Sequence, residues 1–108
     1  WARLGQLYLQ DGFWNGERLL PEGWAEFVSA PAPAWKNAQY GGLFWVNGDK
    51  RWTALPTSAY YMSGAGGQNV IIVPTHDLVV VRQGHRVGQR IGIRGLDNAL
   101  GVLMDALP

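Results

Sequence analysis

The residues best suited to do chemistry in this chain form the segment Gly64-Ala65-Gly66-Gly67-Gln68. The segment precedes a β-branched run at residues 70–73, which continues through Pro74-Thr75-His76-Asp77 into a second run at residues 78–81. Two short apolar runs joined by a polar turn predict an antiparallel hairpin. Glycine inside or just before a strand often marks a close approach by another backbone or a ligand. We therefore expect a glycine-lined strand at the border of a cleft, with backbone amides free to bind a partner.

Two interpretations of Gly66-Gly67-Gln68 remain open from the residues alone. The structural interpretation is a β-bulge or a close crossing of two strands. The functional interpretation is an edge strand whose backbone N–H groups form an oxyanion hole. Such donors stabilise the negative charge that develops on a tetrahedral intermediate.

The first part of the chain predicts two helices. Apolar residues recur at helical spacing from Trp1 to Gln10, and Gly12 supplies a C-terminal stop. Pro21 suits the first position of a second helix, which we expect to run to about Ser29.

The rest of the chain predicts a sheet and a last helix. Residues 40–46 are rich in aromatic side chains and indicate a strand, whereas residues 51–57 fit either a short strand or a loop. Residues 84–95 are polar and glycine-rich, which indicates a loop, and the leucines from Leu96 onward have the spacing of an amphipathic helix. The fold class is therefore α+β, an antiparallel sheet with flanking helices in a single domain.

Composition excludes several classes of protein. The net charge of +1 over 108 residues gives no general field for nucleic acid or an anionic membrane. Without cysteine there are no disulfides or thiolate metal sites, and no apolar run has the length of a membrane span. The chain begins at Trp1, inside a predicted helix, so we expect it to be the later part of a longer protein.

Other polar residues have simpler explanations than chemistry. His76 and Asp77 could form a metal pair with His85, but at a hairpin tip such residues are usual turn formers, and we predict no metal. Arginines recur every fourth residue, which on a helix would make one basic face. The series is Arg82, Arg86, Arg90 and Arg94. The interspersed glycines favour a solvated loop, with Arg82 or His85 holding a substrate carboxylate as the alternative.

Four aromatic residues could line a substrate or pack in the core. They are Trp45, Trp52, Tyr60 and Tyr61. We single out Tyr61 as a candidate wall of a substrate site.

Two segments resemble the C-terminal part of serine β-lactamase-like hydrolases, the superfamily of class C β-lactamases, penicillin-binding DD-peptidases and related esterases. Residues 11–21, DGFWNGERLLP, are similar to a family segment between two helices. Residues 61–68, YMSGAGGQ, with the following VIIVPTHDLVVV, resemble the family's third motif and last two strands. Together they imply the C-terminal portion of a β-lactamase or DD-peptidase fold over residues 1–108.

The resemblance also implies roles for individual residues. The family's Lys-Thr-Gly or His-Thr-Gly motif corresponds here to Ala65, Gly66 and Gly67, a departure closer to the esterase-like branches. These three residues and Tyr61 would bind substrate, and the backbone N–H of Gln68 would be the second oxyanion-hole donor. No cofactor is implied.

The family's nucleophile motif, Ser-x-x-Lys, is absent from the chain. Three residues after Ser29, Ser58 and Ser63 stand Ala32, Tyr61 and Gly66. We therefore predict a fragment that is inactive alone and that needs the N-terminal part of the same protein to act on an acyl substrate.

The alternative is a non-catalytic module that binds a peptide or glycan, favoured by Ala65 where many active members have lysine. The resemblance also favours an extracytoplasmic protein.

Overall fold

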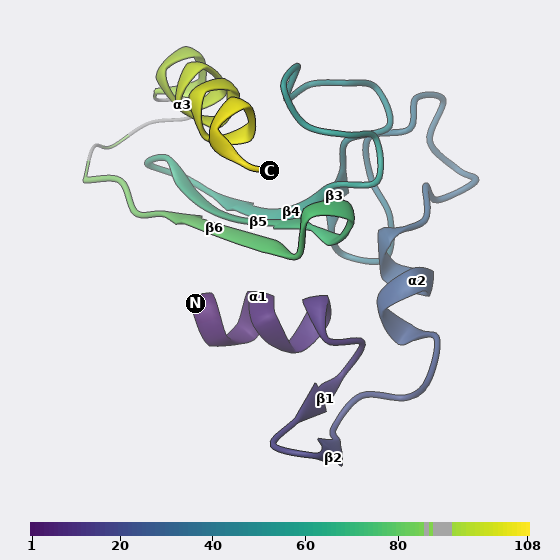
Figure 1. Ribbon diagram of the computed structural model, residues 1–108. Helices are drawn as coiled ribbons and strands as arrows, with labels where there is room; N and C mark the ends of the chain where they lie inside the picture. The colour runs from purple at the N-terminus through teal and green to yellow at the C-terminus, as the bar shows by residue number, and fades with distance from the viewer. Residues whose placement is uncertain (86, 88–91) are drawn as a thin grey trace.

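The computed structural model describes residues 1–85, 87 and 92–108. Its elements are, in chain order, α1 (Ala2–Leu9), β1 (Phe13–Trp14), β2 (Glu17–Arg18), α2 (Trp24–Ser29), β3 (Trp45–Val46), β4 (Tyr60–Gly64), β5 (Gln68–Val73), the 3₁₀ turn η1 (Pro74–His76), β6 (Leu78–Arg82) and α3 (Ile93–Ala106). A four-stranded antiparallel sheet in the order β3-β4-β5-β6 separates α1 from α3 (Figure 1). The predicted α+β class is confirmed.

The predicted hairpin is present as β5, η1 and β6. Ile71 of β5 lies opposite Val80 of β6 on one side and opposite Tyr61 of β4 on the other. Successive side chains of a strand point to opposite faces, so the apolar run of β5 contributes to both faces of the sheet. This explains why the run is apolar throughout rather than alternating.

Each face of the sheet has its own core. On the α3 face, Leu96 and Leu100 pack with Ile71 and Val73. On the α1 face, Ile72 packs with a second cluster of buried residues. That cluster contains Val28, Phe44, Val46 and Tyr60.

The first predicted helix is confirmed as α1, and a glycine lets it lie close to the sheet. A Cβ atom on Gly5 would be only 2.6 Å from Cγ1 of Val79 and 3.0 Å from Cγ1 of Val70. Gly12 follows the helix at φ +83° and its amide bonds the carbonyl of Leu7 at 2.8 Å. These contacts match the helix stop predicted there.

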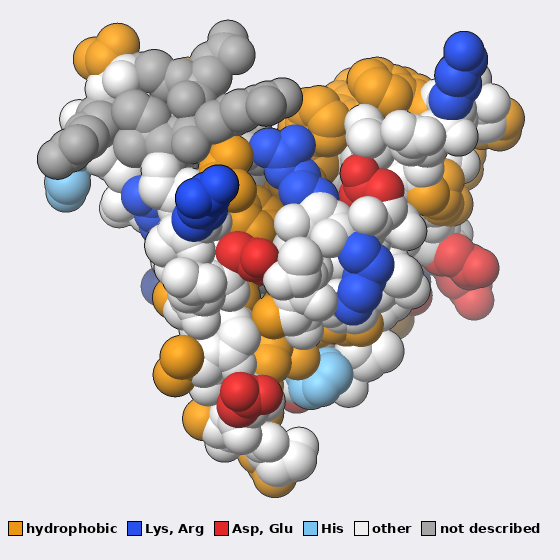
Figure 2. Space-filling view, turned by 90° about the horizontal axis from the view of Figure 1, so that it is seen from above, with side chains coloured by type: hydrophobic (Ala, Val, Ile, Leu, Met, Phe, Trp, Pro, Cys, Tyr) orange, Lys and Arg blue, Asp and Glu red, His pale blue; other side chains and the backbone are white. Residues whose placement is uncertain are grey.

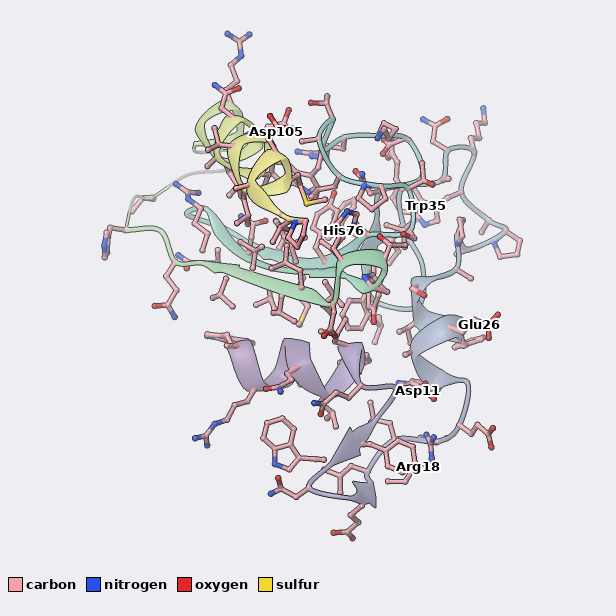
Figure 3. The ribbon with its side chains drawn as sticks, in the orientation of Figure 1. Asp11, Arg18, Glu26, Trp35, His76 and Asp105 are labelled. Atoms are coloured by element: carbon pink, nitrogen blue, oxygen red, sulfur yellow. The ribbon has the colours of Figure 1, made fainter. Side chains whose placement is uncertain are left out.

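Asn15-Gly16 joins β1 and β2 in a tight hairpin. Both residues have positive φ, 49° and 78°, as a type I′ turn requires. Arg18 reaches back to Asp11, with 3.4 Å between its Nη2 atom and the carboxylate (Figure 3). The segment between the first two helices is thus a short β-ribbon.

Two predicted elements differ in extent. The second helix begins at Trp24 rather than at Pro21, because Gly23 adopts left-handed backbone at φ 77° and ends the preceding turn. The strand predicted over residues 40–46 is paired only at Tyr40 and at β3. Between them the chain turns through Leu43, whose φ is 68°.

The last helix is confirmed, but it begins at Ile93, inside the loop predicted for residues 84–95. The arginine series therefore does not form one helical face. Arg82 is in β6 and Arg94 is in α3, whereas Arg86 and Arg90 lie outside the described residues.

Charged side chains of both signs are interspersed over the surface shown in Figure 2. In the described ranges, no helix has both the length and the apolar character to cross a membrane.

Candidate active site

The glycine segment forms a turn rather than a strand. β4 ends at Gly64, which lies opposite Gln68 at the start of β5, and residues 65–67 connect them. Gly66 and Gly67 have φ values of +83° and +85°, which side-chain-bearing residues rarely adopt. Both are buried, whereas Ala65 is exposed. The prediction that the glycines open the strand is therefore wrong, because their backbone is left-handed.

The segment that follows β6 is joined to this turn by hydrogen bonds. The side chain of Gln68 makes two hydrogen bonds with the backbone of Gly84. Its Nε2 donates to the carbonyl at 2.8 Å, and its Oε1 accepts from the amide at 3.1 Å. Arg82 donates from Nη1 to the carbonyl of Gly67 at 3.0 Å. The position of the turn is thus fixed by side chains of β5 and β6.

The outer edge of β4 is open where it runs into the turn. β3 pairs with β4 only at Tyr60 and Tyr61, and residues 62–64 are paired only with β5 among the described strands. An unpaired edge presents backbone N–H and C=O groups that can bind an extended ligand. The edge strand of this site is therefore β4. The prediction that Gln68 lies on an edge strand is wrong, because β5 has β4 and β6 on its two sides.

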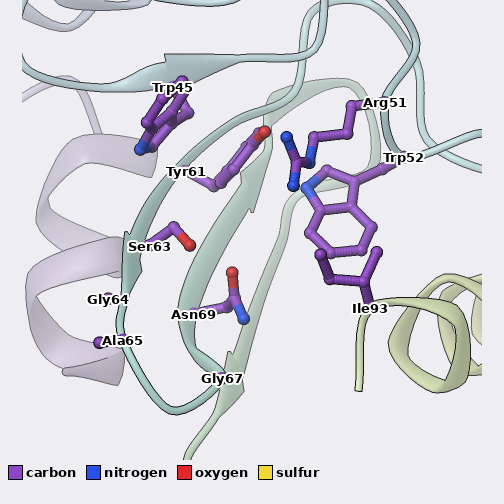
Figure 4. Close-up of a pocket in the computed structure, with 10 residues that line it drawn as sticks. All are labelled: Trp45, Arg51, Trp52, Tyr61, Ser63, Gly64, Ala65, Gly67, Asn69 and Ile93. Atoms are coloured by element: carbon purple, nitrogen blue, oxygen red, sulfur yellow. The ribbon is translucent and has the colours of Figure 1, made fainter. Parts of the chain in front are cut away.

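A hollow of about 430 Å³ opens beside this edge on the α3 face of the sheet (Figure 4). Its lining combines aromatic rings, small residues and three polar side chains. The lining residues are Trp45, Arg51, Trp52, Tyr61, Ser63, Gly64, Ala65, Gly67, Asn69 and Ile93. The volume lies in the range of small-molecule sites.

Buried Asn47 shapes the loop that brings Arg51 and Trp52 to the hollow. Its Nδ2 donates to the carbonyls of Trp52, Leu55 and Pro56 at 3.0–3.2 Å, and its Oδ1 accepts from the amide of Trp52 at 2.9 Å. One side chain therefore replaces the backbone partners that the loop lacks.

The same loop is attached to α3 through Asp97. The carboxylate of Asp97 accepts from the amide of Thr53 at 2.9 Å and from its hydroxyl at 2.8 Å. The hollow is consequently bounded on one side by a loop anchored at both the sheet and the last helix.

Two buried polar groups at the hollow have unmet hydrogen-bonding capacity. Oδ1 of Asn69, a residue only 7% exposed, has no hydrogen-bond partner in the described part of the chain. The indole nitrogen of Trp52 likewise has no hydrogen-bond partner among the described residues. Burial raises the pKa of Tyr61, and the charge of Arg51 partly offsets that rise.

A second hollow, of about 390 Å³, adjoins the first at Ser63, Gly64 and Asn69. It is lined mainly by apolar surface from the start of α1 and the ends of the strands. The lining residues are Trp1, Met62, Ser63, Gly64, Gln68, Asn69, Val70, Val81, Arg82 and Gln83.

The predicted site residues lie in three places: the first hollow, the second hollow and the turn between β4 and β5. Tyr61, Ala65 and Gly67 line the first hollow, and Gln68 lines the second. Gly66 is buried in the turn and lines neither.

Of the four aromatic candidates, three line the first hollow and Tyr60 packs on the α1 face. His76 lies in η1, at the turn between β5 and β6 (Figure 3). The residues that the structure describes contain no group of three or more His, Cys, Asp or Glu arranged for a metal ion.

Sequence reasoning missed Arg51 and Asn69. A signal for Asn69 was present, since it is a polar residue at the start of an otherwise apolar strand. No sequence signal pointed to Arg51, because it lies in a loop whose conformation depends on the distant contacts of Asn47 and Asp97.

The comparison with solved structures agrees with this architecture. No family profile and no curated protein matches the chain. A solved structure titled "Putative 6-aminohexanoate-dimer hydrolase from Bacillus anthracis" superimposes with a TM-score of 0.66 at 23% sequence identity, over 99% of this chain. This chain spans 29% of the length of that protein. The chain thus shares a β-lactamase-like α+β fold with part of that protein.

Proposed function

We propose that this chain is the sheet-bearing, C-terminal part of a serine hydrolase that cleaves an ester, amide or related acyl bond. A serine from the N-terminal part of the same protein attacks the acyl carbon and displaces the alcohol or amine, which leaves with a proton. Water then hydrolyses the resulting acyl-enzyme, releasing the acid and regenerating the serine hydroxyl. The chain itself contributes the wall against which the acyl group lies. Ser29, Ser58 and Ser63 lack the lysine that Ser-x-x-Lys requires.

The observation that carries this proposal is the open edge of β4 beside a hollow. Residues 62–64 leave one side of their backbone unpaired within the described residues, and the first hollow begins at Ser63 and Gly64. An acyl chain can lie along such an edge as an added strand. The same edge leads to the turn from which an oxyanion donor is expected.

The oxyanion donor is a backbone N–H of the turn, and two positions fit the role. Gln68 follows from the sequence resemblance and lines the second hollow. Ala65 is exposed at the open end of β4 and lines the first hollow. At either position the N–H is preorganised, because the turn is held by Arg82 and Gly84.

Exposed apolar side chains support the proposal that more protein covers this chain. Trp1 is 70% exposed, Phe27 64% and Leu43 85%. Large exposed apolar groups mark surfaces that associate with other protein. The N-terminal part of the same protein is the partner that fits a chain spanning 29% of its structural neighbour.

A fluorophosphonate probe, which labels activated serines covalently, tests the proposal in the full-length protein. We expect one labelled serine outside residues 1–108, within Ser-x-x-Lys, and no labelling of the isolated chain. The loop variant Ser58→Ala should label like wild type. Labelling at Ser29, Ser58 or Ser63 would contradict the proposal. A folded full-length protein that stays unlabelled would favour the non-catalytic peptide- or glycan-binding alternative.

A further inference from the structure

The chain contains two Asn-Gly dipeptides, and the fold places them in opposite environments. Asn15-Gly16 forms the tip of the β1–β2 ribbon, whereas Asn47-Gly48 directly follows β3. In such a dipeptide the backbone nitrogen of the glycine can attack the side-chain carbonyl carbon of the asparagine, because glycine has no side chain to obstruct the approach. The reaction requires a mobile asparagine side chain and a glycine amide that is open to water.

Asn15-Gly16 meets both requirements. Both residues are exposed, and a Cβ atom added to Gly16 would meet no other atom within 4 Å. Within the described part of the chain, neither the side chain of Asn15 nor the amide of Gly16 takes part in a hydrogen bond. In Figure 1 the ribbon extends away from the sheet. The two reacting groups are therefore open to solvent.

The tip of the ribbon is held by few contacts. Trp14 lies opposite Glu17, and one further pair, Phe13 opposite Arg18, completes the ribbon. A hairpin of this length is marginally stable, so its tip opens readily. Opening is needed because Asn15, at φ 49°, is in a type I′ turn, in which the next amide points away from the side chain.

Asn47-Gly48 is held closed. Asn47 is fully buried, and its side-chain amide donates three hydrogen bonds and accepts a fourth from the loop that follows. A Cβ atom on Gly48 would overlap the side chain of Ala38, so the glycine is packed as tightly as its neighbour. Turning the Asn47 side chain toward the Gly48 amide would break these hydrogen bonds in a site closed to water.

We propose that Asn15 is a site of spontaneous deamidation and that the fold protects Asn47 from the same reaction. When the ribbon tip opens, the backbone nitrogen of Gly16 loses its proton to hydroxide and attacks Cγ of Asn15. A C–N bond forms, and the side-chain nitrogen takes a proton from water and leaves as ammonia, which closes a succinimide ring. Water then breaks either C–N bond of the ring and leaves aspartate or isoaspartate.

The isoaspartate product ends the pairing of the ribbon. It routes the main chain through the former side chain, which adds one atom between positions 15 and 16. The two-residue turn that sets Trp14 opposite Glu17 then no longer fits. Either product also adds a negative charge two residues from Glu17. The reaction requires no serine, so the proposal goes beyond the hydrolase function and does not depend on it.

Peptide mapping of the full-length protein follows both dipeptides in one experiment. The folded protein is kept in mildly alkaline buffer and digested with trypsin at intervals. Cleavage after Arg3 and Arg18 releases residues 4–18, in which Asn15 is the one asparagine. Cleavage after Lys36 and Lys50 releases residues 37–50, which contain Asn47. Tandem mass spectrometry measures the mass gained when NH₂ is replaced by OH and assigns it to a residue.

We expect deamidation at Asn15 and a rate at Asn47 that is roughly 10²-fold lower, the effect of breaking two or more buried hydrogen bonds before reaction. Asn37 is the control for the glycine, because it is exposed but precedes alanine. It should react much more slowly than Asn15. In guanidinium chloride, which removes the fold, Asn15 and Asn47 should react at similar rates.

Three results would overturn the proposal. Asn15 that reacts in guanidinium chloride but stays intact in the folded protein would show that the ribbon tip does not open to water. Equal rates for Asn15 and Asn47 in the folded protein would show that burial gives no protection. Equal rates for Asn15 and Asn37 would show that Gly16 has no part in the reaction. Serine labelling is measured separately, so failure of this proposal is distinguishable from failure of the hydrolase function.

Discussion

The side-chain amide of Gln68 pairs with the backbone of Gly84 through two hydrogen bonds, of 2.8 and 3.1 Å. The pairing continues the β5–β6 ladder beyond its last backbone pair, Asn69 opposite Arg82. A side chain thereby holds the segment after β6 against the turn that we propose as the oxyanion donor.

Gln68→Ala should therefore destabilise the protein. It removes both bonds from a part-buried site, and we expect a loss of about 1–3 kcal/mol in the free energy of unfolding. Urea denaturation of Gln68→Ala and of Gln83→Ala, an exposed neighbour, measures the difference. Equal stability of the two variants would show that the pairing contributes nothing.

Gly84→Ala should displace the same turn. A Cβ atom at this position would overlap the carbonyl oxygen of Gly66, a backbone atom that cannot rotate away. We expect a destabilisation of about 1–3 kcal/mol, as for other overpacked sites. Gly95→Ala is the control, because its Cβ meets open space in α3, where alanine favours the helix. Thermal denaturation should lower Tm for the first variant and leave it unchanged or raised for the second.

Asn47→Ala should collapse the loop that carries Arg51 and Trp52. The substitution leaves the carbonyls and the amide that Asn47 satisfies without partners in a fully buried site. A loss of roughly 2–4 kcal/mol follows from several unmet hydrogen bonds. Asn37→Ala, at an exposed position, should change the free energy of unfolding by less than about 0.5 kcal/mol. Equal stability of Asn47→Ala and Asn37→Ala would show that these hydrogen bonds do not hold the loop.

Stability should fall at high pH because of Tyr60. Burial raises the pKa of Tyr60 from 10.0 to about 12, with smaller contributions from Tyr8 and Asp11. The unfolded state releases this proton first, so the stabilisation is complete below pH 10 and is lost as the pH rises toward 12. Urea unfolding from pH 8 to 12 should show a smaller decline for Tyr60→Phe than for wild type. Parallel declines would mean that Tyr60 titrates normally in the folded protein.

Local sequence patterns predicted the elements whose own residues follow a clear strand or helix pattern. The β5–β6 hairpin and α3 follow from β-branched runs and leucine spacing. No local pattern predicted β4, because Ser63 and Gly64 interrupt its apolar pattern and its extended form comes from pairing with β5.

The candidate site was less predictable than the fold. The glycines predicted an unusual backbone conformation, and the segment has one. The left-handed φ values of Gly66 and Gly67 make it a turn rather than a strand. Arg51 reaches the hollow only through a loop closed by Asn47 and Asp97, which are distant in sequence from each other. No local pattern reports such contacts.

The central claim is that the turn between β4 and β5 supplies an oxyanion-hole donor, and replacing single backbone amides with esters tests it most directly. An ester at Ala65 or at Gln68 removes one N–H and keeps the side chain. In the full-length protein, with a p-nitrophenyl ester as substrate, we predict that one of these variants loses about 10²-fold or more in kcat while KM changes little. An ester at Val81, in β6, is the matched control. Unchanged kcat for both turn variants would contradict the account.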